Sequence, residues 1–207
     1  FIEGLGIGAT AVEELTGYPS ILGGRVKTLH PMVFGGILGR RADEGDRAQM
    51  AEYGIPEIDL VIVDLYPFEQ TVAGGGTPQE IIEKIDIGGI SLIRAAAKNF
   101  ADTVIVPSVN QYGELMELLE TQNCATTLEQ RRRFAAQAFM VSSAYDSAIF
   151  NWFNIQEQIP AFRAAYDGGS VLRYGENPHP SATFYGHLAQ MFDKLHGKDI
   201  SSHNMLD

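Results

Sequence analysis

A continuous apolar run at residues 58–66, Ile-Asp-Leu-Val-Ile-Val-Asp-Leu-Tyr, restricts the choice of fold more than any other stretch of this chain. A short run that is rich in Val and Ile, with apolar residues on both faces, predicts a strand buried between two helical layers of a parallel sheet. Ligands of open α/β sheets bind at the carboxyl ends of the strands. Asp64 and Tyr66 close this run and are therefore the first candidates for chemistry.

The segments around this run alternate between extended and helical patterns. We expect a short strand at 10–15 and a second strand at 102–107, with a strong helix at 90–98 that Asn99 ends. Long helical periodicity at 127–153 predicts one or two helices, started by a capping box over residues 126–129. This order predicts an α/β fold followed by the beginning of a second domain.

The helical pattern weakens at residues 156–170, which end in Asp167-Gly-Gly-Ser170. Such a stretch is typical of a linker between domains. We therefore expect a first domain at 1–155, a linker at 156–170 and the start of a second domain at 171–207.

Two glycine turns carry candidate anion-binding groups. Gly23 and Gly24 precede Arg25, Lys27 and Thr28, which is compatible both with a phosphate loop and with a solvated basic loop. A second glycine turn, at 86–89, feeds the helix at 90–98, so backbone N–H groups at its start are expected to hold an anion or a carbonyl oxygen.

Composition and net charge restrict the classes of molecule that the chain is expected to bind. The 207-residue chain has a formal net charge of −11, which argues against nucleic acid and anionic membranes as partners but leaves room for a local phosphate pocket. Its single cysteine, Cys124, excludes an internal disulfide framework and fits a reducing cytoplasm. No run is long and apolar enough to span a bilayer. Because the first residue is Phe1 and not Met, we expect a piece of a longer protein.

Five motifs together resemble the bifunctional enzymes of purine biosynthesis that join IMP cyclohydrolase to AICAR transformylase. The resemblance covers essentially the whole chain. The motifs are Arg25-Val-Lys-Thr-Leu-His-Pro31, Asp64-Leu-Tyr-Pro-Phe68, Ile85-Asp-Ile-Gly-Gly89, Arg94-Ala-Ala-Ala-Lys-Asn99 and Leu172-Arg-Tyr-Gly-Glu-Asn-Pro-His179.

The resemblance implies a doubly wound, mainly parallel α/β sheet of the methylglyoxal-synthase-like type, followed by the beginning of a second α/β domain. It implies IMP cyclohydrolase activity, which closes formyl-AICAR to IMP with loss of water and needs no cofactor or metal. In the full-length enzyme it also implies transfer of a formyl group to AICAR from 10-formyltetrahydrofolate. The expected partners are small nucleotides and a second copy of the chain, in the cytoplasm.

The resemblance also assigns roles to residues of the matching motifs. It implies that Lys98 is the proton donor or acceptor, with Lys27, Tyr66 and Asp86 as its catalytic neighbours. The residues implied to bind substrate are Arg25, Val26, Lys27, Thr28, Val63, Asp64, Asp86, Ile87 and Gly88 in the cyclohydrolase, and Arg173 and Tyr174, which are implied to bind AICAR in the transformylase.

Two other functions on the same fold stay open at this point. A methylglyoxal synthase needs a carboxylate near the phosphate loop, and leaves the 86–89 turn and Lys98 unexplained. A nucleotide-binding regulatory module needs the phosphate-binding residues but does not need Tyr66, Asp86 and Lys98 together. Nucleotide binding and turnover after Lys98→Ala discriminate an enzyme from such a module.

Overall fold

The computed structural model describes residues 1–171 and 183–186, and the chain divides into two units, Phe1–Ile159 and Pro160–Asp207. In the first unit β1 (Leu60–Ile62) pairs in parallel with β2 (Val104–Val106). In the second unit β3 (Gly169–Val171) pairs antiparallel with β4 (Thr183–Tyr185). Parallel strands need a long crossover connection, and helices of the first unit supply it between β1 and β2.

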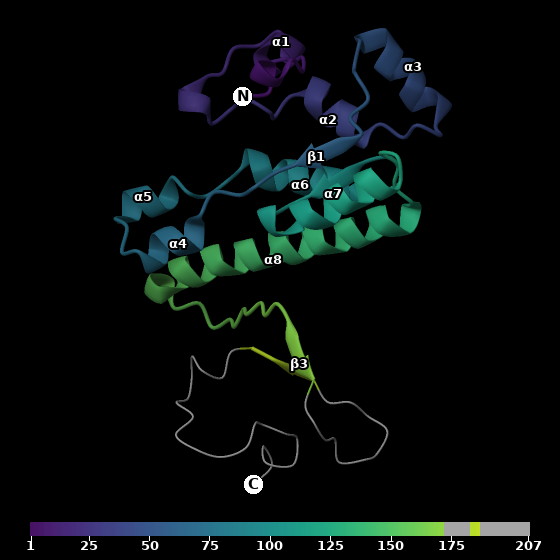
Figure 1. The fold of residues 1–207 in the computed structure, drawn as a ribbon. Helices are drawn as coiled ribbons and strands as arrows, with labels where there is room; N and C mark the ends of the chain where they lie inside the picture. Colours follow the sequence, from purple (N-terminus) through teal and green to yellow (C-terminus); the bar gives the residue numbers. More distant parts are fainter. Residues whose placement is uncertain (172–182, 187–207) are drawn as a thin grey trace. The chain divides into compact units, whose positions relative to one another are not determined.

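Helices make up most of the first unit (Figure 1). Among the described residues, none of them combines the length and the apolar character needed to cross a membrane. The α-helices are α1 (Val12–Thr16), α2 (Pro31–Leu38), α3 (Glu44–Tyr53), α4 (Phe68–Ala73), α5 (Pro78–Ile82), α6 (Gly88–Lys98), α7 (Tyr112–Thr121) and α8 (Leu128–Glu157), and the 3-10 turns are η1 (Glu3–Leu5), η2 (Leu22–Gly24) and η3 (Val109–Gln111).

The core of the first unit lies where α6 and α8 pack against each other and against β2. Ile93 of α6, Ile105 of β2 and Phe134 of α8 are fully buried in it. All three residues of β2 are buried, as expected for a strand covered by helices on its faces. The expected α/β class with parallel strands is therefore confirmed.

The prediction for residues 58–66 is only partly right. The strand is shorter than the apolar run, and Ile62 is 48% exposed. The backbone N–H of Val63 still donates to Val106 O at 3.0 Å, but the chain then leaves the sheet, since Ser108 is the N-cap of η3. The apolar run therefore contains a three-residue strand, and β2 is the more buried of the two.

Two local predictions are wrong. Residues 10–15 do not form a strand, since α1 covers most of them, with two acidic residues in its first turn and Gly17 in the left-handed conformation at its end. The capping box of α8 lies one residue later than expected: the hydroxyl of Thr127 accepts from the N–H of Gln130, and the Gln130 side chain accepts from the N–H of Thr127. Residues 127–153 then fall in one helix and not two.

The predicted end of the helix at 90–98 is confirmed, since Asn99 closes α6. Thr77 forms a capping box with Glu80 at the start of α5, with Pro78 in the first helical turn. Phe134, Ala138 and Tyr145 of α8 are buried, so the apolar face of that helix is a core face.

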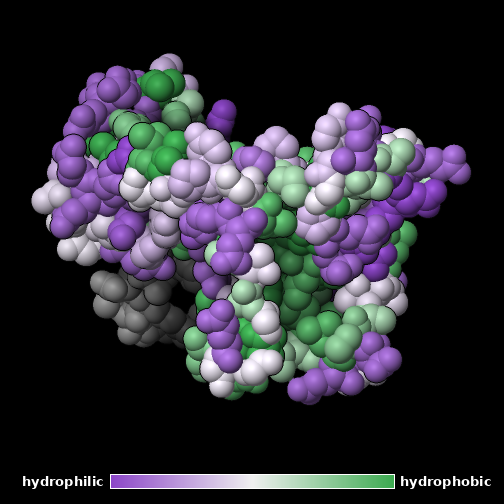
Figure 2. Space-filling view, turned by 90° about the horizontal axis from the view of Figure 1, so that it is seen from above, coloured by the Kyte–Doolittle hydropathy of each residue, from purple (hydrophilic) through white to green (hydrophobic). Residues whose placement is uncertain are grey.

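The N-terminal segment is the least buried part of the first unit. No residue from 1 to 30 is buried. Among the described helices and strands, α1 packs mainly on α2. Apolar side chains remain visible on this side of the molecule, which Figure 2 shows from above. Within this segment, Leu5, Ile7 and Leu22 are each more than half exposed. The loop that carries Arg25 and Lys27 is therefore held by few tertiary contacts.

Candidate active site

Polar side chains gather at the carboxyl end of β1. Asp64 is exposed and its Oδ2 accepts a hydrogen bond from the hydroxyl of Tyr112 at 2.5 Å, which raises the pKa of Tyr112. Tyr66 is 56% exposed, and Lys84 Nζ lies 5.9 Å from the centre of its ring, within range of a cation–π contact. The segment after β1 and the segment before α6 are thus neighbours.

The start of α6 is built around Asp86. The carboxylate of Asp86 is buried, and its Oδ1 accepts the N–H of Gly89 at 2.6 Å. A Cβ on Gly89 would lie 2.6 Å from Oδ2 of Asp86, and one on Gly88 would lie 3.0 Å from the hydroxyl oxygen of Thr28. Glycine is required here because two side chains approach the helix start closely.

Several backbone donors at this helix start have no acceptor in the part of the chain that the structure describes. The N–H groups of Ile87, Gly88 and Ile90 make no hydrogen bond to any described residue, whereas that of Gly89 is taken by Asp86. Free N–H groups at the first turn of a helix favour an anion or a developing negative charge. Thr28 adds a hydroxyl next to them. We call Thr28, Asp64, Tyr66, Asp86 and Gly88 the carboxyl-end cluster.

The cations of the predicted phosphate loop pair with acids that the sequence did not single out. Arg25 forms an ion pair with Glu83, and Lys27 Nζ lies 3.2 Å from Glu13 Oε1. All four side chains are at least one-third exposed, so water weakens both pairs. Any anion that binds Arg25 and Lys27 has to compete with these carboxylates. Neither Glu13 nor Glu83 has a sequence signal that predicts this role.

Lys98 lies at the other end of α6. Ten residue steps separate it from Gly88, which corresponds to about 15 Å along the helix axis and exceeds the reach of a lysine side chain. Its ammonium group is exposed and makes no ion pair or hydrogen bond to any residue that the structure describes. Arg94, one turn earlier, is held by α8 through Ser142 Oγ at 3.4 Å and the ring of Phe139 at 5.6 Å.

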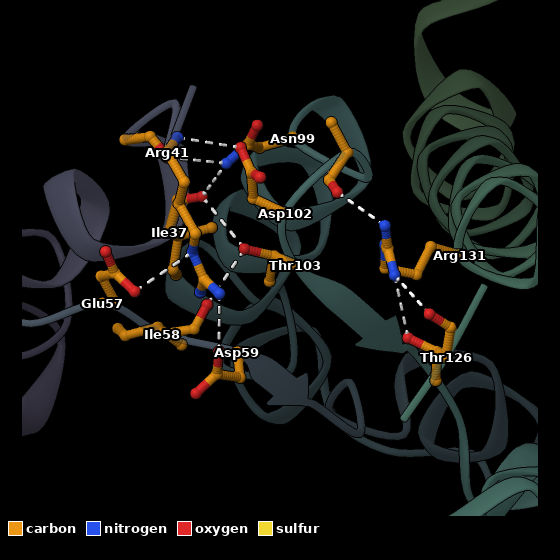
Figure 3. Close-up of polar contacts among 12 residues, drawn as sticks. Ile37, Arg41, Glu57, Ile58, Asp59, Asn99, Asp102, Thr103, Thr126 and Arg131 are labelled. Atoms are coloured by element: carbon orange, nitrogen blue, oxygen red, sulfur yellow. Dashed lines mark hydrogen bonds and ion pairs between the residues drawn. The ribbon is translucent and has the colours of Figure 1, made fainter. Parts of the chain in front are cut away.

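The residues next to Lys98 belong to a different polar group, at the amino ends of β1 and β2 (Figure 3). Buried Asn99 donates to Ile37 O at 2.9 Å and to Gly39 O at 3.1 Å. Thr103 is fully buried and donates to Ile58 O at 3.0 Å. These bonds place the end of α6 beside the start of the strands, so Lys98 is far from the carboxyl-end cluster.

Two arginines complete this second group. Arg131 donates to Phe100 O at 2.9 Å, to Ala101 O at 2.8 Å and to Thr126 O at 2.7 Å. Arg41 Nη1 contacts Asp59 at 2.8 Å, while its Nη2 is buried without a partner among the described residues. A cavity of about 400 Å³ is lined by both arginines and by apolar side chains. We call Arg41, Asn99, Asp102, Thr103 and Arg131 the amino-end cluster.

The structure brings together part of the predicted site. Thr28, Asp86, Ile87 and Gly88 meet at the start of α6, and Asp64 and Tyr66 lie at the end of the neighbouring strand. Val63 packs against the core, and Val26 forms an isolated bridge with Ile21. The described chain does not bring Lys98 to these residues. Arg173 and Tyr174 lie outside the described residues.

Two tyrosines that contact this region were not predicted as site residues. Tyr112 binds Asp64, and Tyr145 of α8 binds the backbone on both sides of Ile85. Both contacts join residues at least 48 positions apart in the chain. No local pattern in the sequence predicts such pairs.

Two protein families match the chain. The family described as "AICARFT/IMPCHase bienzyme" matches residues 96–207, and the "MGS-like domain" family matches residues 1–91. The first match covers more than half of the chain, and the second covers the segment that contains β1, the carboxyl-end cluster and the start of α6.

Curated relatives and one solved structure agree with these matches. A protein of Bacteroides thetaiotaomicron named "Bifunctional purine biosynthesis protein PurH" is 61% identical over 207 residues, and one of Bradyrhizobium diazoefficiens with the same name is 45% identical over 216 residues. Each alignment covers 100% of this chain but only 41% and 40% of the relative, so the chain spans about two-fifths of their length. The "Crystal structure of ForH" matches with a TM-score of 0.63 and 37% identity, over 74% of this chain and 79% of that one.

Proposed function

Because this chain belongs to the AICARFT/IMPCHase bienzyme family, we propose that it carries the IMP cyclohydrolase part of a bifunctional enzyme of purine biosynthesis. The reaction closes formyl-AICAR to IMP. The carboxamide nitrogen attacks the formyl carbon and loses one proton, the formamide nitrogen loses another, and the formyl oxygen leaves with both as water. The enzyme must hold two groups together, move protons and stabilise a negative oxygen.

The start of α6 is the observation that carries this proposal. Its free N–H groups at Ile87, Gly88 and Ile90 are donors for an oxygen that becomes negative during ring closure. Buried Asp86 fixes the turn by accepting the N–H of Gly89. Thr28 beside Gly88 brings the phosphate-loop motif to the same place.

The individual roles follow the motifs of the family. Lys27, Tyr66 and Asp86 are the proposed catalytic neighbours of Lys98, which gives or takes the proton. The ion pairs of Arg25 and Lys27 with Glu83 and Glu13 have to open when the nucleotide phosphate binds. The proposed nucleotide-binding residues are Arg25, Val26, Lys27, Thr28, Val63, Asp64, Asp86, Ile87 and Gly88.

The position of Lys98 supports a homodimer with shared sites. About 15 Å of helix separates Lys98 from Gly88, so a reacting base held at the start of α6 is beyond the reach of Lys98 of the same copy. A second copy can supply its own exposed Lys98 to that site. In a two-fold dimer the exchange is reciprocal, and two equivalent sites result.

Mixing two inactive variants tests this arrangement. If Asp86 and Lys98 of one site come from different copies, co-refolded Lys98→Ala and Asp86→Asn chains regain roughly a quarter of the native activity, since half of the random dimers carry one intact site. Each variant alone stays inactive. A mixture as inactive as its components would contradict a shared site and leave both residues in one copy.

The rest of the proposal concerns the longer protein. There, Arg173 and Tyr174 bind AICAR, and 10-formyltetrahydrofolate gives the formyl group in the transformylase reaction. We propose a cyclohydrolase domain at 1–155, a linker at 156–170 and the start of the transformylase domain at 171–207. Cyclohydrolase itself needs no cofactor or metal. We also propose a cytoplasmic location, supported by the single cysteine, Cys124.

The direct test is the conversion of formyl-AICAR to IMP, followed by ultraviolet absorbance, in this chain and in a full-length protein that contains it. IMP formation by the full-length protein is the expected result. Nucleotide binding without any IMP formation by that protein would instead indicate a nucleotide-binding module on the same fold.

A further inference from the structure

Tyr145 makes two hydrogen bonds to the backbone that leads into α6. Its hydroxyl accepts the N–H of Asp86 at 2.8 Å and donates to Lys84 O at 2.5 Å. One side chain on α8 therefore satisfies a donor and an acceptor two residues apart. The next residues along the chain, Ile87 and Gly88, carry the free N–H groups of the helix start.

The ring of Tyr145 is fixed by a buried aromatic cluster. It contacts Phe68 edge to face at 6.2 Å between ring centres, and Phe68 contacts Trp152 in the same way. Phe68, Ile81 and Tyr145 form the buried part of this cluster. Phe68 follows Tyr66 by two residues, so the cluster supports both segments that carry the candidate site.

The hydroxyl of Tyr145 can both donate and accept a hydrogen bond. Burial raises the pKa of Tyr145, so the group stays protonated at neutral pH and can donate to Lys84 O while it accepts from Asp86. Neither Ser nor Phe can replace it at this distance from α8, because only a phenol combines an apolar ring with a hydroxyl at its far end.

We propose that Tyr145 is a positioning residue for ring closure, which acts by fixing the backbone of the 84–88 segment so that the N–H groups of Ile87 and Gly88 point at the reacting oxygen. The inference rests on the proposed cyclohydrolase function. Tyr145 touches no substrate in this arrangement. Small displacements of positioned donors reduce rates strongly, since their contribution depends on alignment in the transition state.

The test compares Tyr145→Phe with Ile149→Val in a full-length protein that contains this chain. Ile149 packs in the same cluster but makes no contact with the 84–88 backbone that the structure describes, so its variant loosens the cluster without releasing the turn. We expect Tyr145→Phe to lower kcat by about 10- to 100-fold with less than about a threefold change in KM. Ile149→Val should keep native kcat, and both variants should show similarly small decreases in Tm.

Amide hydrogen exchange supplies a readout that does not depend on turnover. In Tyr145→Phe, the hydrogen-bonded amides of Asp86 and Gly89 should exchange at least about tenfold faster than in the unmodified protein, while Ile149→Val leaves them unchanged. Equal kcat in the two variants overturns the inference, even where exchange becomes faster. If the unmodified protein forms no IMP, the proposed function fails and the inference fails with it.

Discussion

The two ends of the β1/β2 layer use polar side chains differently. At the amino ends, Asn99, Thr103 and Arg131 donate most of their side-chain N–H and O–H groups to backbone carbonyls of neighbouring elements (Figure 3). At the carboxyl ends, Asp64 and Tyr66 are exposed, and N–H groups at the start of α6 have no acceptor in the described chain. Asn99, Thr103 and Arg131 are therefore bonded within the chain, whereas the N–H groups at the start of α6 are left open for a ligand.

Lys98 and Asn99 show the same contrast between an open and a bonded polar group, although they are adjacent in the sequence. The ammonium of Lys98 is exposed and unpaired among the described residues, while the amide of Asn99 is buried and bonded twice. Their substitution is therefore expected to affect different properties of the protein: catalysis for the first and stability for the second.

Lys98→Ala has the largest expected effect. It should lower kcat by about 10²- to 10⁴-fold, the usual loss when a proton-transfer group is removed, and leave product binding nearly unchanged. Steady-state kinetics and IMP titration calorimetry measure the two quantities. Lys98→Arg is the matched control for charge, and it should be nearly as inactive because a guanidinium does not exchange protons at neutral pH. Native turnover by Lys98→Ala would remove this role.

Asn99→Ala should destabilise the fold by about 1–3 kcal/mol, since the partly buried carbonyl of Gly39 loses its side-chain donor and the buried carbonyl of Ile37 keeps only the hydroxyl of Thr103. Urea denaturation measures the change in the free energy of unfolding. Asn110→Ala is the control, because Asn110 is exposed and its side chain makes no hydrogen bond to a described residue; its cost should stay below about 0.5 kcal/mol. Equal costs for both would mean that the amino-end bonds contribute nothing.

A local cap stabilises the start of α5. Thr77→Ala breaks the capping box that starts α5 and should cost about 1 kcal/mol. Thr77→Ser keeps the capping hydroxyl and should cost much less. Thermal unfolding of the two variants measures the difference, and a loss in both alike would point to the methyl group of Thr77 and not to the cap.

The smallest expected effect is the acid sensitivity of Asp46. Hydrogen bonds from Arg40 lower the pKa of Asp46 to about 2, below its usual value. A lowered pKa in the folded state stabilises the fold above the ordinary carboxylate pKa of about 4, and this stabilisation is lost as pH falls toward 2. Asp46→Asn should therefore flatten the decrease of Tm between pH 4 and pH 2. An unchanged slope would show that this exposed pair is screened by water.

The local signals in the sequence predicted helices better than strands. The helix that Asn99 ends and the helical periodicity at 127–153 depend on residues close together in the chain, and both predictions are confirmed. The strand at 58–66 was predicted too long, because its length depends on where its partner β2 ends, at Val106. The segment at 10–15 was assigned to a strand for which the described residues offer no partner.

The site shows the same division. Its motifs identified the residues at the start of α6 and at the end of β1, since glycine turns and strand ends are readable from local pattern. The partners of these residues were not predicted: Tyr112 for Asp64, Tyr145 for Asp86, Glu13 for Lys27 and Glu83 for Arg25. Such pairs depend on how α5, α7 and α8 pack, which no local pattern encodes.

The amino-acid sequence alone determines the α/β class, the family resemblance and the kinds of reactive group along the chain. Residue type, turn chemistry and motif are local properties, so they can be read without the tertiary structure. Tertiary structure decides which of these groups meet. It places Thr28 and Asp86 at one end of α6 and Lys98 at the other. The physical reason is that a helix is a rigid rod of fixed rise, so residues that a motif assigns to one site lie about 15 Å apart when they stand at its opposite ends.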